Sequence, residues 1–213
     1  MNVTTEAALS PAKSWLAQAH SELVFSRRVQ VLSRSLAQVL PLNAHVLDVG
    51  CGDGSIAALI GQQRPDLTLT GIDVLVRPHT RIPVTEYDGK TIPYPAGAFE
   101  AVLFVDVLHH TPDPLRLLRE AARVATKAIV LKDHTRDGWL AGPVLRLMDW
   151  VGNAPHGVVL PYNYWAEREW RAAFAELGWE PKVWRQQLGL YPWPASLVFE
   201  RSLHFIARLE NVA

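Results

Sequence analysis

The chain has a single cysteine, Cys51, so no disulfide can form within it. This favours a reducing compartment, and we expect a cytoplasmic protein. Charge of either sign is not in excess, because 21 Lys and Arg residues balance 21 Asp and Glu residues. A balanced chain lacks the broad basic field that holds nucleic acid phosphates. No run of about 18 apolar residues is present, and the N-terminus has no apolar signal-peptide core. We therefore expect neither a nucleic acid partner nor stable membrane association.

The 213 residues, 49% of them hydrophobic, suit one domain with a substantial core. Apolar spacing predicts a helix over residues 12–40. Strand and helix patterns then alternate, which is typical of a parallel sheet with helices on both faces. The expected strands cover 45–50, 66–74, 84–88, 101–108, 128–134, 181–187 and 203–210, and the expected helices cover 55–64, 113–124 and 164–178. The expected parts of the single domain are an N-terminal helical segment (1–40), a cofactor-binding half (41–134), a substrate-cap insertion (135–195) and a last strand (196–213).

The stretch "VLDVGCGDGS", residues 46–55, places glycines at positions 50, 52 and 54 between a strand and a helix. Such a turn lets a ligand approach the backbone closely. The dinucleotide-binding pattern would place its third glycine at position 55, which is Ser55, so a nicotinamide-dependent oxidoreductase is disfavoured. Asp48 would repel a pyrophosphate but suits a ligand with an ammonium or sulfonium charge. Asp73 lies about twenty residues beyond the loop, where an acidic residue takes ribose hydroxyls. S-adenosylmethionine carries both groups.

The segments "VLDVGCGDGS", "GIDV" and "YDGKTIPYPAGAFEAVLFVDVLHHTPDPLRLLREAARV" resemble the class I S-adenosylmethionine-dependent methyltransferases of the small-molecule, type 11-like branch. The resemblance covers about residues 45–134. It implies a Rossmann-like sheet of seven strands, six parallel and the last antiparallel. Two departures concern the outer frame: "FE" stands at 99–100 in place of "FD", and the Pro-Gly-Gly turn before the fifth strand is missing.

The resemblance also implies which residues hold S-adenosylmethionine or its product S-adenosylhomocysteine. Asp48 and the glycine loop would lie against the methionine part, Asp73 would bind the ribose, and Asp88 would face the adenine. The expected cofactor-binding residues are Asp48, Gly50, Cys51, Gly52, Gly54, Asp73, Val74, Asp88, Gly89, Asp106 and Val107. Asp48 could instead cap local backbone N–H groups, and Asp88 could instead be a structural turn residue. Cys51 is expected to fill space and not to act as a nucleophile.

Candidate catalytic residues come from histidines and from the end of the fifth strand. Histidine titrates near neutral pH and can serve as a general base. The candidates are His109, His110, Asp133, His134 and His156. His109 and His110 could equally line the pocket, and Asp133 could cap the next helix. No metal site is expected.

The stretch 149–165 is expected to be a long loop that caps the substrate, since such loops are usually functional. Its candidate substrate-binding residues are Asn153, His156, Tyr162 and Tyr164. The alternative is an aromatic packing layer over the sheet edge.

The expected reaction is in-line displacement of a methyl group from S-adenosylmethionine to a small-molecule acceptor. A protein that binds the cofactor without turnover has the same motifs and remains the alternative. The methylated atom (O, N, C or S), the need for a general base and the choice between monomer and homodimer stay open.

Overall fold

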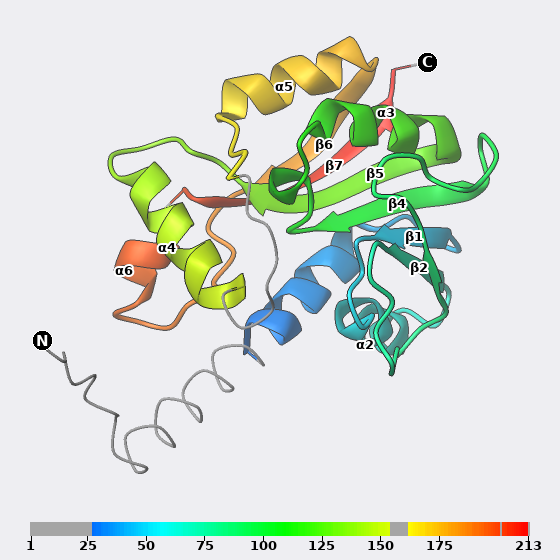
Figure 1. The fold of residues 1–213 in the computed structure, drawn as a ribbon, viewed down its shortest axis with the longest axis horizontal. Helices are drawn as coiled ribbons and strands as arrows, with labels where there is room; N and C mark the ends of the chain where they lie inside the picture. Colours follow the sequence, from blue (N-terminus) through cyan, green and yellow to red (C-terminus); the bar gives the residue numbers. More distant parts are fainter. Residues whose placement is uncertain (1–26, 154–161, 201, 213) are drawn as a thin grey trace, which may run out of the picture.

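A computed structural model describes residues 27–153, 162–200 and 202–212. Its centre is a seven-stranded sheet with the order β3-β2-β1-β4-β5-β7-β6 (Figure 1). The strands are β1 (His45–Val49), β2 (Thr68–Asp73), β3 (Val84–Glu86), β4 (Phe99–Val105), β5 (Ala125–His134), β6 (Trp179–Arg185) and β7 (His204–Asn211). β7 pairs antiparallel with both β5 and β6, while the pairs among β1 to β5 are parallel. The expected Rossmann-like methyltransferase topology is therefore confirmed.

Helices cover both faces of the sheet. A helix over residues 27–39 and α2 (Ser55–Gln63) lie on one face, and α3 (Pro114–Val124) and α5 (Glu167–Glu176) lie on the other (Figure 1). The remaining helices are the short η1 (Leu108–His110), α4 (Ala141–Asn153) and α6 (Ser196–Phe199). α4 and α6 lie beyond the carboxyl ends of β4 and β5.

The two faces have separate cores, and this explains the unbroken apolar runs of the central strands. Along β4, Val102 and Phe104 face the α3 and α5 side, and Ala101 and Leu103 face the side of the helix over 27–39. All four side chains are fully buried. Alternate residues point to opposite faces of a strand, so a strand covered twice must be apolar at every position.

Local signals set the helix ends as expected. Asp113 caps α3, since its side chain accepts a hydrogen bond from the backbone N–H of Arg116 at 3.0 Å, and Pro114 occupies the first turn. Gly178 follows α5 with φ of +71°, a conformation that favours glycine.

The structure bears on three expectations, and one of them is wrong in part. Of the helix expected over 12–40, residues 12–26 lie outside the described residues and helix is observed over 27–39. The expected loop over 149–165 is wrong in its first part, because residues 149–153 belong to α4. The apolar stripe of α4 is interrupted in sequence by Gly142 and Pro143, which its first turn tolerates. The segment 135–195 also contains α5 and β6, elements that pack on or belong to the sheet.

No helix in the described ranges is long and apolar enough to span a membrane.

Candidate functional site

The loops after β1, β2, β4 and β5 meet at one edge of the sheet, because these strands run parallel. Ligands of open α/β sheets bind at this carboxyl edge. Predicted site residues lie at the end of each of these strands or in the loop that follows it.

The glycine loop after β1 is tied to its neighbours at close range. A Cβ on Gly50 would lie 2.6 Å from Cγ2 of Val107, so only glycine fits against this second residue after β4. The backbone N–H of Gly52 donates to Oδ2 of Asp73 at 2.8 Å. A Cβ on Gly52, whose φ is +60°, would meet no atom within 4 Å among the described residues. The loop therefore has one packed side and one open side, where a ligand can approach the backbone.

Asp48 is a buried carboxyl with an exposed fraction of 3%. Burial, helped by the charge of Asp73, raises its pKa to about 7. Neither a cationic side chain nor a backbone N–H in the described ranges offsets this rise. Among the described residues, the carboxylate of Asp73 likewise accepts backbone N–H groups alone, those of Gly52 and Leu75. Two carboxylates beside an open loop with no paired cation suit a ligand that brings positive charge.

Cys51 packs inside the loop. Its Sγ would lie 2.4 Å from a Cβ on Gly71, and burial raises the pKa of its thiol. A thiol held in its neutral form is a poor nucleophile, which agrees with the expected space-filling role.

The loops after β2 and β3 form the outer part of the edge. Val74 is 57% exposed, and its Cγ1 lies 3.0 Å from a Cβ position on Gly89. Asp88 uses Oδ1 to accept the backbone N–H groups of Lys90 and Thr91 at 2.8 and 2.7 Å. Asp88 thus stabilises a turn, as expected for a structural turn residue. This turn lies next to the exposed apolar side chain of Val74.

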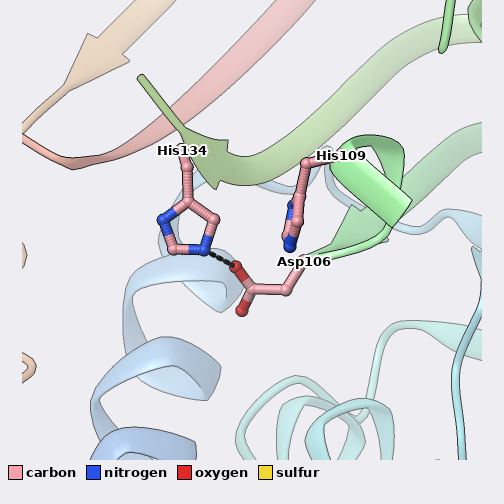
Figure 2. A group of neighbouring side chains, drawn as sticks. All are labelled: Asp106, His109 and His134. Carbon is pink, nitrogen blue, oxygen red and sulfur yellow. Dashed lines mark ion pairs between the residues drawn. The ribbon is translucent and has the colours of Figure 1, made fainter. Parts of the chain in front are cut away.

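Asp106 follows β4 in a left-handed conformation with φ of +57°. Its carboxylate pairs with Nε2 of His134 at 3.2 Å (Figure 2). It also pairs with Arg28 at 2.5 Å and with Lys132. Burial acts to raise the pKa of Asp106, but the charges of Lys132 and Arg28 outweigh it and hold the pKa well below its usual value. Burial and the Lys132 charge lower the pKa of His134 to about 4, so this imidazole is neutral. This ion-pair group fastens the helix over 27–39 to the ends of β4 and β5.

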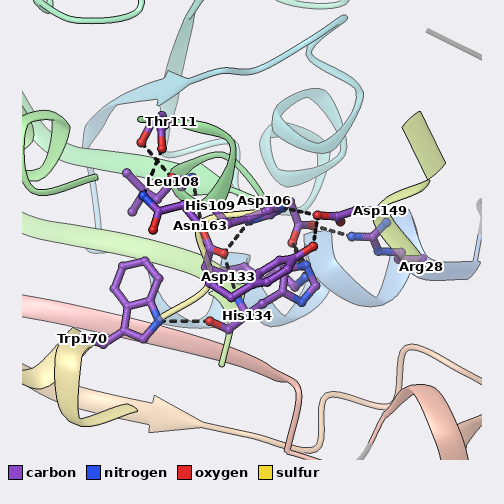
Figure 3. Close-up of polar contacts among 12 residues, drawn as sticks. Arg28, Asp106, Leu108, His109, Thr111, Asp133, His134, Asp149, Asn163 and Trp170 are labelled. Carbon is purple, nitrogen blue, oxygen red and sulfur yellow. Dashed lines mark hydrogen bonds and ion pairs between the residues drawn. The ribbon is translucent and has the colours of Figure 1, made fainter. Parts of the chain in front are cut away.

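A second polar group lies beside the first and is called here the acceptor cluster: His109, His110, Asp133, Asp149 and Tyr164. Nδ1 of His109 lies 2.6 Å from Oδ1 of Asp133, and its Nε2 lies 3.6 Å from Oδ2 of Asp149 (Figure 3). The Tyr164 hydroxyl donates to the same Oδ2. The rings of His109 and His110 are 4.0 Å apart between centroids.

The two adjacent histidines of the acceptor cluster have opposite pKa shifts. Burial acts to lower the pKa of His109, but Asp133 and Asp149 outweigh it and raise the pKa to about 10. Burial, followed by the charge of His109, lowers the pKa of His110. At neutral pH one ring is a cation between two carboxylates and the other is a neutral imidazole. Titratable groups with diverging pKa values are typical of functional sites.

Backbone hydrogen bonds fix the acceptor cluster. Asp133 accepts the backbone N–H of Leu108 at 3.1 Å, so it caps η1 and not the helix that follows β5. The backbone N–H of Asn163 donates to the carbonyl of His109 at 3.2 Å. Nε1 of Trp170 donates to the carbonyl of His134 at 3.0 Å. The segment that begins at residue 162 therefore lies beside η1 and the end of β5.

The predicted catalytic residues His109, His110, Asp133 and His134 come together at this edge. Tyr164 is buried with them, and Tyr162 lies 6.3 Å from Tyr164 between ring centroids. His156 and the side chain of Asn153 lie outside the described residues.

Sequence reasoning missed Arg28, Lys132 and Asp149. Lys132 alone carried a signal, as a charged residue within an apolar strand. Arg28 and Asp149 lie on helices, where a single charge is ordinary.

Comparison with known proteins gives the family. Residues 18–182 match the model of a family described as a methyltransferase domain, which is more than half of the chain. The chain belongs to the class I S-adenosylmethionine-dependent methyltransferases.

Curated relatives match the chain over parts of their length. The 27-O-demethylrifamycin SV methyltransferase of Amycolatopsis mediterranei is 35% identical over 108 residues, which are 44% of this chain and 39% of that enzyme. A trans-aconitate 2-methyltransferase of Escherichia coli is 25% identical over 191 residues, 79% of this chain and 76% of that enzyme. The chain thus matches less than half the length of the rifamycin enzyme.

Solved structures share the fold of the chain at low identity. A Pyrococcus horikoshii protein has a TM-score of 0.65 at 15% identity and covers 88% of this chain and 91% of its own. The geranyl diphosphate C-methyltransferase of Streptomyces coelicolor has a TM-score of 0.63 at 13% identity and covers 85% of this chain and 78% of its own. At this level of identity the likeness concerns the fold.

Proposed function

We propose that the chain transfers the methyl group of S-adenosylmethionine to a small-molecule acceptor, which binds at the acceptor cluster. The observation that carries this proposal is the division of the carboxyl edge into two parts. One part has two carboxylates beside an open glycine loop, with no cationic side chain paired to them in the described ranges, and the other has a buried set of histidines and carboxylates.

The residues after β1 and β2 fit the cofactor. Asp48 would lie against the ammonium and sulfonium charges, since a nearby cation lowers the free energy of its buried carboxylate. Asp73 would accept the ribose hydroxyls, and Gly52 leaves room for the methionine part. Val74 would cover the adenine beside Asp88, in agreement with its exposed apolar side chain.

Burial of the acceptor cluster supports a small acceptor. His109, Asp133 and Tyr164 are 1%, 0% and 7% exposed, with α4 and the segment from residue 162 packed over them. A folded macromolecule cannot bring a reacting atom to such a place without displacing these elements. Relatives whose names include rifamycin and trans-aconitate agree with a small acceptor.

The bound cofactor supplies a methyl group on a positively charged sulfur, which is already activated toward displacement. The chain then has to align the acceptor atom with that group and exclude water, and alignment of this kind can lower a barrier by about 7 to 11 kcal/mol. An O–H or N–H acceptor must also lose a proton, and a group of the acceptor cluster would accept it.

The test is methyl transfer from labelled S-adenosylmethionine into cell extract, followed by separation into organic, aqueous small-molecule and macromolecular fractions. Asp73→Ala is the variant. Glu180→Ala is the matched control, because it removes an exposed carboxylate on β6, away from the site. We expect label in a small-molecule fraction with wild type and control and none with Asp73→Ala.

Two other outcomes contradict parts of the proposal. Label in the macromolecular fraction would exclude a small acceptor as the main substrate. Confirmed binding of S-adenosylhomocysteine with no label in any fraction would favour the binding protein without turnover.

A further inference from the structure

The two histidines of the acceptor cluster differ in how their rings are engaged. Nδ1 of His109 is bound by Asp133 at 2.6 Å, and its Nε2 forms an ion pair with Asp149 at 3.6 Å. The ring of His110 stacks on that of His109 but makes no hydrogen bond or ion pair with the described residues. His110 is half-buried, while His109 is 1% exposed. The His110 ring can therefore both meet a ligand and pass a proton to solvent.

The carboxylates of the acceptor cluster are poor proton acceptors. Asp133 accepts hydrogen bonds from His109 and from the backbone N–H of Leu108. Asp149 accepts the Tyr164 hydroxyl and faces the His109 cation. Burial acts to raise the pKa of each carboxyl, but the charge and the hydrogen bond of His109 outweigh it and lower both pKa values.

His134 is also unsuited to take a proton from an acceptor. It is 3% exposed, and its Nε2 lies 3.2 Å from the carboxylate of Asp106. Burial and the charge of Lys132 lower its pKa to about 4. A base this weak gives little driving force for proton transfer at neutral pH.

His110 lies at the border between the two parts of the carboxyl edge. It ends η1, and its backbone N–H donates to the carbonyl of Val107 at 2.9 Å. Val107 packs against Gly50 of the glycine loop. One short turn of chain therefore joins the loop that fits the cofactor to the His110 imidazole.

Charged groups from several elements act on the His110 ring. Burial lowers its pKa, and the adjacent His109 cation lowers it further. The carboxylates that act to raise it come from α4, from the residue after β4 and from β5: Asp149, Asp106 and Asp133. The net shift is downward, so the ring is neutral at pH 7 and can accept a proton there.

We propose that His110 is the general base of methyl transfer, and that the acceptor is a molecule whose reacting O–H or N–H keeps its proton at neutral pH. This assignment rests on the proposed function. The acceptor atom forms a bond to the methyl carbon while the carbon–sulfur bond breaks, and the electron pair of that bond stays on the sulfur of S-adenosylhomocysteine. The proton of the acceptor passes to a ring nitrogen of His110 and from there to solvent. An acceptor already ionised at neutral pH, such as a carboxylate, does not need this base.

The test is transfer of label from S-adenosylmethionine into the small-molecule fraction of cell extract by His110→Ala. General bases contribute about 10²- to 10⁴-fold, so transfer should fall at least about 100-fold. Affinity for S-adenosylhomocysteine in calorimetry should stay unchanged. Added imidazole should restore part of the transfer, because the half-buried position is reached from solvent. His45→Ala is the matched control, since it removes another half-buried histidine, at the amino end of β1.

A second measurement needs neither turnover nor a folded variant. In an NMR titration of the wild-type histidine rings, His110 should be neutral at pH 7 and gain its proton below about pH 6.5, the ordinary pKa of histidine. His109 should keep its proton up to about pH 10.

The two proposals fail in different ways. Transfer by His110→Ala at the wild-type rate would overturn the assignment of the base and leave the proposed function in place. A His110 ring that still carries its proton above pH 7 would also overturn the assignment. Absence of label from every fraction with the wild type would refute the proposed function, and the assignment with it.

Discussion

Asp48→Asn should stabilise the cofactor-free chain at alkaline pH while weakening cofactor binding. The carboxyl is 3% exposed, and its pKa is raised to about 7 from 3.8. A carboxyl with a raised pKa in the folded state loses stability as pH rises from its unfolded pKa to its folded pKa. Between about pH 4 and pH 7 the folded chain therefore loses stability on account of Asp48, and the full penalty is present above pH 7.

The size of the effect follows from the shift. About three pKa units correspond to about 4 kcal/mol, which is the upper limit of the gain from removing the charge. A buried amide that lacks a full set of hydrogen bonds costs about 1 to 3 kcal/mol. A net gain of about 1 to 3 kcal/mol remains, or roughly 2 to 12 °C in Tm for a chain of this size.

The assay is thermal unfolding at pH 8.5 and pH 4.5, with and without S-adenosylhomocysteine. Asp48→Asn should melt above the wild type at pH 8.5 and level with it or below it at pH 4.5, where the amide cost remains and most of the charge penalty is gone, and the ligand should raise its Tm less. Asp53→Asn is the matched control in the same loop. Hydrogen bonds from Ser55 outweigh the slight burial of Asp53 and lower its pKa, so this change should bring no gain.

Equal melting of wild type and Asp48→Asn at pH 8.5 would refute the reasoning, as would the same gain at both pH values. In either case the buried Asp48 carboxylate would not destabilise the cofactor-free chain in the way proposed.

Three further predictions concern other charges of the site. Asp73→Ala should lower affinity for S-adenosylhomocysteine by at least about 10-fold in calorimetry, because charged hydrogen bonds to the ribose are worth about 1.5 to 3 kcal/mol each, while Tm changes little; equal loss of both would contradict the ribose role. In denaturant titrations, the wild type should lose stability from about pH 6.5 to pH 10, as His109 gives up the proton that its raised pKa retains, and His109→Gln should show a flatter profile. Asp106→Ala should cost about 3 to 5 kcal/mol in urea unfolding, since buried Lys132 loses its contacting carboxylate, whereas Glu176→Ala at an exposed pair should cost less than about 1 kcal/mol. A similar small loss in both variants would contradict a structural role for the Asp106 group.

The sequence predicts most of the sheet because each strand carries its own pattern. β4 and β5 are apolar along their length, as strands covered on both faces must be. The sequence does not predict α4, because Gly142 and Pro143 interrupt its helical pattern. Packing of Leu145 against Tyr164 stabilises this helix. Contacts of that kind join residues whose pairing no local pattern encodes.

The sequence by itself determined the glycine loop, Asp48 and Asp73, because short turns depend on the residues within them and lie at fixed places after their strands. The tertiary structure alone decided the charge state of the acceptor cluster. His109 meets Asp133 and Asp149 across 24 and 40 residues of chain, and Asp106 meets Arg28 across 78. Burial and pairing set the charge of each of these groups, and both arise only when β4, β5, α4 and the helix over 27–39 pack together.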